Sequence, residues 1–247
     1  MDELSAPCGI VPAAGAGLRL RPFNYPKELL PVAYAPMDDG LRPVLAIELA
    51  LQHLVDGGCS GAVIAVGAQK LELVRLLRSG EALGLPLAYV HQENPSGLTD
   101  EVLCCTPWAV DRPCVLVMPH TWFTPGDVVQ QLMAVLGDGA DLALAVFPTE
   151  RTAQLGPVEY DTDGTVLAVY DKPEGPAPGN TWGVAAWRPT FTRFIEAWAD
   201  DQRRATPIGH AFHAAIEAGL DVRAVPFPEG CYQDLGTPRS LADLVLR

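Results

Sequence analysis

The sequence is short of basic residues. It has 17 Lys and Arg against 30 Asp and Glu, so its formal net charge at pH 7 is −13. A protein that binds nucleic acid along the phosphate backbone relies on clustered cations. We therefore expect no nucleic acid partner, and any phosphate that the chain binds must be held by a few local cations.

The sequence lacks the cysteine spacings that are typical of metal sites, and it also lacks long apolar runs. The six cysteines form no Cys-x-x-Cys or zinc-binding pattern, and most of them lie within apolar runs. No apolar run approaches the roughly 18 residues of a membrane span, and the first residues lack the basic segment of a secretory leader. These absences predict buried free thiols, a cytoplasmic location and no membrane partner.

Two familiar phosphate-binding signatures are also missing from the glycine-rich segment near the N-terminus. A Walker loop would need Gly-x-x-x-x-Gly-Lys-Ser/Thr, and the dinucleotide fingerprint would need a third Gly where Leu20 stands. Instead, a short apolar run leads into a loop of small residues, which are Ala13, Ala14, Gly15, Ala16 and Gly17. Their backbone N–H groups can face an anion, while Arg19 and Lys27 neutralise its charge. The alternative is a tight strand exit in which the small residues serve packing alone.

Apolar runs alternate with segments at helical spacing over the first 147 residues. The runs predict strands at 62–66, 87–90, 114–118 and 141–147, and the segments predict helices at 43–57, 69–79, from near 98, and at 126–136. This order predicts βαβ units in a mainly parallel, doubly wound sheet that binds ligands at the carboxyl ends of its strands. Hydrophobic residues make up 49% of the 247 residues, which suits one large α/β domain.

The second part of the chain has a different pattern. Alternating segments at 157–161 and 165–170 flank a turn at 161–164 and predict an antiparallel hairpin. A strand at 183–187, helices at 190–199 and 206–219, and a strand at 221–225 are expected to follow.

The loop and the segment after it together resemble a family signature. Residues 15–22 read Gly-x-Gly-x-Arg-Leu-x-Pro and residues 26–32 read Pro-Lys-x-Leu-Leu-Pro-Val, which is similar to the sugar-1-phosphate nucleotidylyltransferases, the family of glucose-1-phosphate thymidylyltransferase. The resemblance implies a single-domain, Rossmann-like nucleotidyltransferase fold over 1–247. Its nucleotide-binding part would be about 1–125 and its sugar-binding part about 126–247, with a mainly parallel central sheet, flanking helices and a small antiparallel hairpin region.

The resemblance continues at four later places. The loop 91–98 implies that Gln92 reads the base, with Gly97 also at the nucleotide. The hairpin from Gly156 to Asp161 implies that Gly156 and Glu159 hold sugar hydroxyls, and Asp171-Lys172-Pro173 implies that Lys172 grips the sugar phosphate. Asp234 begins a motif whose Asp binds magnesium in the family. Among the tryptophans, Trp182 is expected to narrow the sugar pocket, although a core position is the alternative.

The implied reaction joins a nucleoside triphosphate and a sugar-1-phosphate, or a cyclitol phosphate, into an NDP-sugar and pyrophosphate. Both reactants are anions, so the site has to supply position and positive charge. Arg19 would hold the β- and γ-phosphates, Lys27 would stabilise charge at the transferring centre, and Lys172 would hold the acceptor phosphate. Mg²⁺ would bridge the α- and β-phosphates.

His120 departs from the family pattern, which places a second metal-binding Asp after the central strand. Because magnesium prefers oxygen ligands, a metal site of Asp234 and His120 should bind Mg²⁺ weakly or favour Mn²⁺ or another divalent metal. His120 as a structural residue or a direct phosphate contact stays open. So does an alternative function, a catalytically impaired homologue that binds nucleotide or sugar phosphate as a regulatory or partner subunit. The sequence allows a homo-oligomer and identifies neither base nor sugar.

Overall fold

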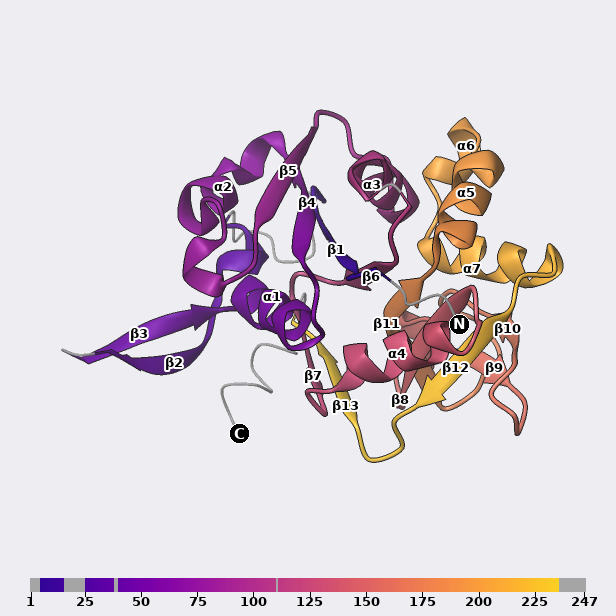
Figure 1. Ribbon diagram of the computed structural model, residues 1–247. Coiled ribbons are helices and arrows are strands. Elements are labelled where there is room, and N and C mark those ends of the chain that lie inside the picture. Colours follow the sequence, from indigo (N-terminus) through magenta and orange to yellow (C-terminus); the bar gives the residue numbers. More distant parts are fainter. Residues whose placement is uncertain (1–4, 16–24, 38–39, 110, 236–247) are drawn as a thin grey trace.

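A computed structural model gives the structure of the protein for residues 5–15, 25–37, 40–109 and 111–235. These residues build a seven-stranded sheet in the order β12-β8-β11-β6-β1-β4-β5, which runs through the middle of the molecule (Figure 1). Its strands are β1 (Cys8–Ala13), β4 (Gly61–Gly67), β5 (Leu87–Gln92), β6 (Cys114–Val117), β8 (Leu142–Pro148), β11 (Asn180–Trp187) and β12 (Val222–Pro226).

The sheet is mainly parallel, as the sequence predicted. β1 pairs in parallel with both β4 and β6, β4 pairs in parallel with β5, and β8 pairs in parallel with β12. Only β11 runs against its two neighbours among these strands, β6 and β8. The predicted mainly parallel α/β sheet is therefore confirmed.

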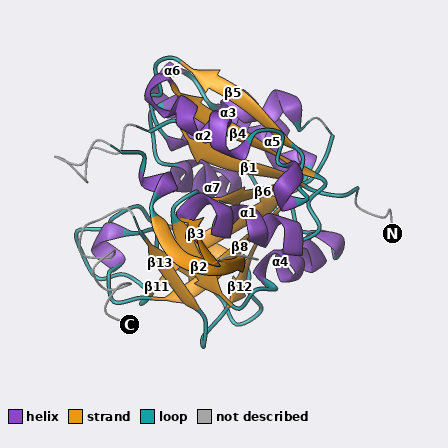
Figure 2. Ribbon diagram, turned by 90° about the vertical axis from the view of Figure 1, so that its left-hand side faces the viewer, coloured by secondary structure: helices purple, strands orange, loops and turns teal. Residues whose placement is uncertain are grey.

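Helices cover both faces of the sheet (Figure 2). Side chains alternate along each strand, so Val11 packs in one apolar cluster with α1, α2 and α4 while Ile10 packs in the other with α3, α5 and α7. Such burial on both faces is why the strands read as continuous apolar runs. The helices are α1 (Ala46–Asp56), α2 (Leu71–Leu77), α3 (Leu98–Cys105), α4 (Val128–Gly137), α5 (Pro189–Trp198), α6 (Asp201–Arg204) and α7 (Ile208–Glu217).

Three two-stranded ribbons complete the described part of the chain. The predicted hairpin is present as β9 (Val158–Tyr160) and β10 (Val166–Val169). Two ribbons were not predicted: β2 (Pro31–Met37) with β3 (Gly40–Leu45), and β7 (Thr121–Thr124) with β13 (Cys231–Asp234). The β2–β3 hairpin extends away from the body of the molecule (Figure 1).

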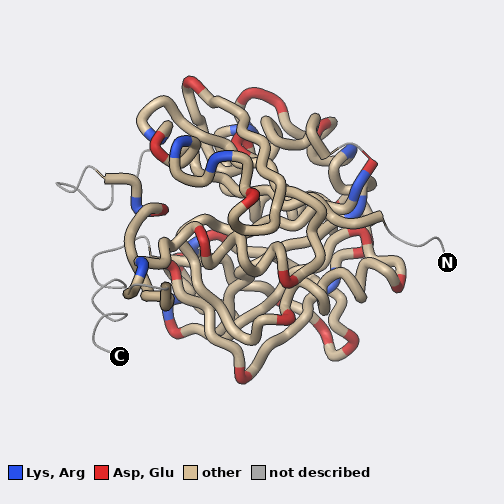
Figure 3. Tube along the Cα trace, turned by 60° about the vertical axis from the view of Figure 1, so that its left-hand side comes forward, with Lys and Arg blue, Asp and Glu red and all other residues tan. Residues whose placement is uncertain are grey.

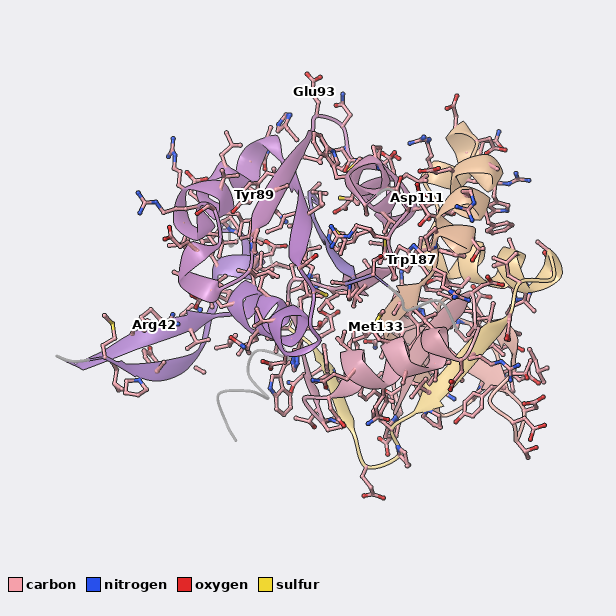
Figure 4. All side chains as sticks on the ribbon, in the orientation of Figure 1. Arg42, Tyr89, Glu93, Asp111, Met133 and Trp187 are labelled. Atoms are coloured by element: carbon pink, nitrogen blue, oxygen red, sulfur yellow. The ribbon has the colours of Figure 1, made fainter. Side chains whose placement is uncertain are left out.

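The predicted helix at 43–57 begins at Ala46, because residues 40–45 belong to β3. Glu48 marks this start: its carboxylate accepts the N–H of Leu45 at 2.9 Å and a hydrogen bond from Arg42 at 3.0 Å. Arg42 lies on the projecting hairpin (Figure 4). The helical spacing of the apolar residues was correct from residue 47 on, but strand pairing between β2 and β3 determines the structure of the preceding segment.

The cysteines are free thiols, and the expectation that they are buried holds for only half of them. Cys8, Cys105 and Cys114 are buried, whereas Cys59, Cys104 and Cys231 are half-buried. The last two lie on an amphipathic helix and a ribbon strand, whose solvent-facing sides the apolar pattern did not reveal. Within the described residues, no helix has the length and apolar character needed to cross a membrane.

Candidate active site

The carboxyl edge of the parallel strands is where the predicted site loops lie. β1 ends at Ala13 and β6 at Val117, and the parallel pairing of these strands brings both ends to the same edge. Ala14, which is buried, and Gly15 follow β1 directly. Three predicted loop residues, Ala16, Gly17 and Arg19, lie outside the described residues.

A cavity of about 720 Å³ opens at this edge. It is bounded by the chain after β6, the start of α3, the segment before α7 and residues of β11 and β13. Six residues predicted for the site from sequence line it: Gly97, His120, Gly156, Lys172, Trp182 and Asp234. The fold therefore brings together residues that are widely spaced along the chain.

His120 stands between a lysine and a carboxylate. Its Nε2 lies 2.8 Å from Nζ of Lys27 and 3.4 Å from Oδ1 of Asp234, and the residue is only 6% exposed. The β7–β13 ribbon places Asp234 close to His120, because Asp234 pairs with Thr121 and the N–H of Leu235 donates to the His120 carbonyl at 2.9 Å. Sequence reasoning named all three side chains but did not foresee the contact between Lys27 and His120.

The side chains of Lys27, His120 and Asp234 determine how this part of the site could bind a metal ion. Within the described residues, no group of three or more His, Cys, Asp or Glu side chains is arranged to hold a metal ion. The ammonium group of Lys27 lies beside His120. Magnesium takes oxygen ligands and is held in many phosphate-transfer sites by one or two carboxylates together with substrate phosphates. The oxygens of Asp234 fit a cation carried by a phosphate ligand, and the Lys27 ammonium lies on the same imidazole nitrogen of His120 that faces Asp234.

The sugar-side residues are packed against one another. Gly156 accepts the backbone N–H of Trp182 at 2.9 Å, and a Cβ at position 156 would come within 2.3 Å of the Trp182 indole nitrogen. Only glycine fits under this ring. Lys172 donates its backbone N–H to Leu155 at 2.9 Å and has a left-handed φ of 44°, which turns the chain at the cavity wall.

Glu159 does not join these residues. Its side chain is exposed, is not part of the cavity lining, and accepts a hydrogen bond from the Tyr170 hydroxyl at 2.6 Å. That hydrogen bond to the carboxylate is the main cause of the raised pKa of Tyr170. A role for Glu159 at the sugar therefore requires a ligand that extends beyond the cavity walls.

Gln92 is buried at the end of β5. Its amide nitrogen donates to Oδ2 of Asp100 at 2.6 Å, and Arg204 donates to the other oxygen of Asp100 at 3.0 Å. The Gln92 oxygen, Oε1, is buried and has no hydrogen-bond partner among the described residues. A buried acceptor of this kind is stabilised by a donor from a ligand.

Sequence reasoning missed the carboxylate beneath the small-residue loop. Glu101, only 8% exposed, accepts the backbone N–H of Ala14 at 2.9 Å. Burial raises the pKa of Glu101, while the Ala14 N–H and the charges of Lys70 and Lys27 act in the opposite direction. Nearby, Glu28 and Lys70 form a buried ion pair at 2.8 Å. A charged residue within the otherwise apolar face of a predicted helix was the available signal for Glu101.

A mainly parallel sheet with a cavity at its carboxyl edge, lined by Lys172, defines an α/β protein of the kind that binds ligands at this edge. The chain belongs to the nucleotidyl transferase family, which it matches over residues 8–246. This membership confirms the resemblance to sugar-1-phosphate nucleotidylyltransferases that the sequence motifs indicated.

Named relatives agree with this assignment. The chain is 28% identical over 95% of its length to the low-salt glycan biosynthesis nucleotidyltransferase Agl11 of Haloferax volcanii. It is 26% identical over 96% of its length to a glucose-1-phosphate thymidylyltransferase of Streptomyces antibioticus. In each case it spans 64% of the relative's length. A Bacillus anthracis protein solved in complex with a sucrose shares the fold, with a TM-score of 0.85 at 19% identity over 97% of this chain and 94% of that one.

Proposed function

We propose that the protein is a nucleotidylyltransferase that condenses a nucleoside triphosphate with a sugar-1-phosphate, or a sugar-like cyclitol phosphate, to an NDP-sugar and pyrophosphate. The cavity is the observation that carries this proposal. It is lined by Gly97 and His120 from the expected nucleotide-binding part, about 1–125, and by Gly156, Lys172 and Asp234 from the expected sugar-binding part, about 126–247. A shared cavity is what a two-substrate condensation requires. The Streptomyces relative named above supports the same substrate classes.

Each lysine has a role in this proposal. An oxygen of the sugar phosphate attacks the α-phosphorus of the triphosphate, and pyrophosphate leaves on the opposite side. Lys27 stabilises the charge that develops at the α-phosphate, and Lys172 in the cavity wall holds the acceptor phosphate in line. No general base is needed, because the attacking phosphate is already ionised. Arg19 is proposed for the β- and γ-phosphates.

The nucleotide is proposed to arrive with its divalent cation. The expected ion is Mg²⁺, or Mn²⁺ or another divalent metal, and Asp234 is the carboxylate that would contact it. Such an ion would neutralise phosphate charge and fix the angle between the phosphates. Gln92, whose buried oxygen lacks a partner among the described residues, is proposed to accept a hydrogen bond from the base. Gly156, Trp182 and Glu159 are proposed for the sugar.

The location and assembly of the protein are part of this proposal. A cytoplasmic location is supported by the free thiols. The expected partners are small anionic substrates, with no nucleic acid and no membrane, and the proposal accommodates a homo-oligomer.

One observation favours a second candidate function. His120 stands where the family motif places a carboxylate, so the protein is alternatively a catalytically impaired homologue that binds nucleotide or sugar phosphate and regulates a partner subunit. Pyrophosphate release distinguishes the two functions. A panel of nucleoside triphosphates crossed with sugar-1-phosphates, each with magnesium, manganese or zinc, should give release for at least one pair if the protein is a transferase. Binding of both substrates without release under every condition would establish the second function instead.

A further inference from the structure

We propose that Asp100 and Arg204 are positioning residues that set the base preference of the protein, because they hold the Gln92 amide with its oxygen turned toward the base. Neither residue was predicted for the site from the sequence. The proposal rests on the proposed function in one respect, namely that Gln92 meets the base. It starts from the 2.6 Å between the Gln92 amide nitrogen and Oδ2 of Asp100.

The Asp100 carboxylate fixes the orientation of the Gln92 amide. Besides the Gln92 nitrogen, its Oδ2 accepts the Ser96 hydroxyl at 3.0 Å, and its Oδ1 accepts a hydrogen bond from Arg204 at 3.0 Å. An ionised carboxylate has acceptors and no donors, so only the NH₂ group of Gln92 can face it. The Gln92 oxygen, Oε1, therefore has to point to the other side.

This oxygen is left for a ligand. Gln92 is only 9% exposed, and its Oε1 is buried without a hydrogen-bond partner among the described residues. Gln92 pairs with Gly67 at the end of β4, and a Cβ at Gly67 would come within 2.6 Å of the Ala14 carbonyl oxygen. Gln92 thus lies close to the small-residue loop after β1, where the nucleotide is expected. An N–H donor from the base would satisfy Oε1.

Arg204 ties this arrangement to the cavity wall. It is the last residue of α6, and residues 205–207 after it line the cavity. Because Arg204 occupies Oδ1 of Asp100, the carboxylate cannot turn without losing an ion pair, and Oδ2 stays on Gln92. The Asp100 side chain is 16% exposed, so the ion pair is partly shielded from solvent and salt.

A fixed amide oxygen selects bases by their hydrogen-bond donors. A base that places an N–H at Oε1 gains a hydrogen bond, whereas a base that places a carbonyl or a bare ring nitrogen there leaves two buried acceptors facing each other. Uracil and cytosine have nearly the same shape but opposite donor and acceptor patterns on their pairing edges, and so do guanine and adenine. The affinity ratio within each pair therefore reports which end of the amide faces the base.

Replacing Asp100 by asparagine should turn the Gln92 amide over. In Asp100→Asn, Arg204 keeps the side-chain oxygen, so the new NH₂ group faces Gln92, which has to rotate and present its own NH₂ group to the base. We expect the ratio of UTP to CTP affinity, or of GTP to ATP affinity if purines bind, to change about tenfold, the effect of one hydrogen bond to a buried group. Calorimetric titration measures both ratios. Ser96→Ala removes another donor from the same carboxylate and is the control, so it should leave the ratios unchanged.

Two double variants separate amide orientation from helix stability. Asp100 also lies in the first turn of α3, where a carboxylate favours the helix start whatever Gln92 does. Adding Asp100→Asn to Gln92→Leu should leave the affinity ratios unchanged, because no amide remains to turn. Adding Arg204→Met to Asp100→Asn should restore the wild-type ratio in part, since the introduced asparagine can then turn its oxygen to Gln92. A ratio unchanged by Asp100→Asn, the same change in the Gln92→Leu background, or no recovery with Arg204→Met would overturn the proposal.

A spectroscopic test needs no substrate. In nitrogen-15 NMR of the free wild-type protein, one proton of the Gln92 NH₂ group should resonate downfield, because the Asp100 carboxylate holds it. This shift should persist in Ser96→Ala and disappear in Asp100→Asn. An NH₂ group with the shifts of a free glutamine would overturn the proposal. A downfield proton together with no binding of any triphosphate would instead contradict the proposed function, on which the base preference rests.

Discussion

Lys27 and Lys172 come from segments far apart in the sequence; Lys172 lines the cavity, and Lys27 contacts His120, which also lines it. We expect Lys27→Ala and Lys172→Ala each to lose about 2–4 kcal/mol of transition-state stabilisation, because in the proposed function each lysine is a preorganised cation at a phosphate group. Steady-state pyrophosphate release measures the loss. Arg75→Ala is the control, since Arg75 is 79% exposed and pairs with Glu72 on the surface of α2. Rates for both lysine variants equal to that of the control would remove these residues from the site.

Glu101, which accepts the N–H of Ala14, makes the stability of the protein depend on pH. Burial raises its pKa above the ordinary value of 4.5, so the folded protein keeps a proton that the unfolded chain has released. The stability from this group is full below that ordinary value and is lost as the pH rises through the raised value. In Glu101→Gln the amide oxygen can still accept the Ala14 N–H but does not titrate.

We therefore expect the melting temperature of Glu101→Gln, relative to the wild type, to increase as the pH is raised across this window. Thermal unfolding of both proteins over a series of acidic to neutral buffers measures the difference. A difference that stays constant with pH would mean that Glu101 ionises as an ordinary exposed carboxyl does.

At the scale of elements, the junction between α3 and the segment before α7 shapes one wall of the cavity. A Cβ at Gly97 would lie 2.8 Å from the carbonyl oxygen of Ala205, and Thr99 donates its hydroxyl to the Thr206 carbonyl at 2.8 Å. Gly97→Ala should therefore push residues 205–207 outward, cost about 1–3 kcal/mol of stability and weaken triphosphate binding.

A second glycine provides the matched control. Gly137 ends α4, has a helical backbone, and a Cβ there meets nothing within 4 Å. Gly137→Ala should be neutral or stabilise the protein by up to about 1 kcal/mol, through the lower entropy of the unfolded chain. Denaturant unfolding compares the two variants, and equal stability changes would contradict the close contact at Gly97.

The sequence predicted the helices and strands in which the apolar residues follow a clear pattern. Continuous apolar runs gave the buried parallel strands, because covering both faces of a strand removes the alternation of polar residues. The β7–β13 ribbon was missed because its two strands are far apart in the sequence. The β2–β3 ribbon was missed because its strands are largely exposed. Short half-exposed segments of this kind carry little hydrophobic pattern.

The sequence named several of the residues that line the cavity but not the contacts between them. Family motifs named Lys172, Asp234 and Gly156, and the cavity includes all three. The contact between His120 and Asp234 depends on the β7–β13 ribbon, and the bond between Glu101 and the Ala14 N–H depends on how α3 packs against β1. Tertiary packing of this kind leaves no local signal in a single sequence.

At the scale of the whole molecule, the protein has the same sign of charge as the substrates proposed for it. The net charge is −13, and acidic residues occur in many elements along the described chain (Figure 3). In the proposed function two anionic substrates meet in one cavity, so their affinity has to come from a few cations in fixed positions rather than from the overall field. We therefore expect substrate affinity to depend on Lys27 and Lys172.

Tracing the α-phosphorus tests the central claim most directly. Wild-type protein is incubated with a nucleoside triphosphate labelled at the α-phosphorus and a sugar-1-phosphate, and the labelled products are separated. If the protein is a nucleotidylyltransferase, the label appears in an NDP-sugar, only when both substrates are present, in equal amount to the pyrophosphate released. Label that stays in the triphosphate although both substrates bind, or that appears in a nucleoside monophosphate without sugar, would contradict the account.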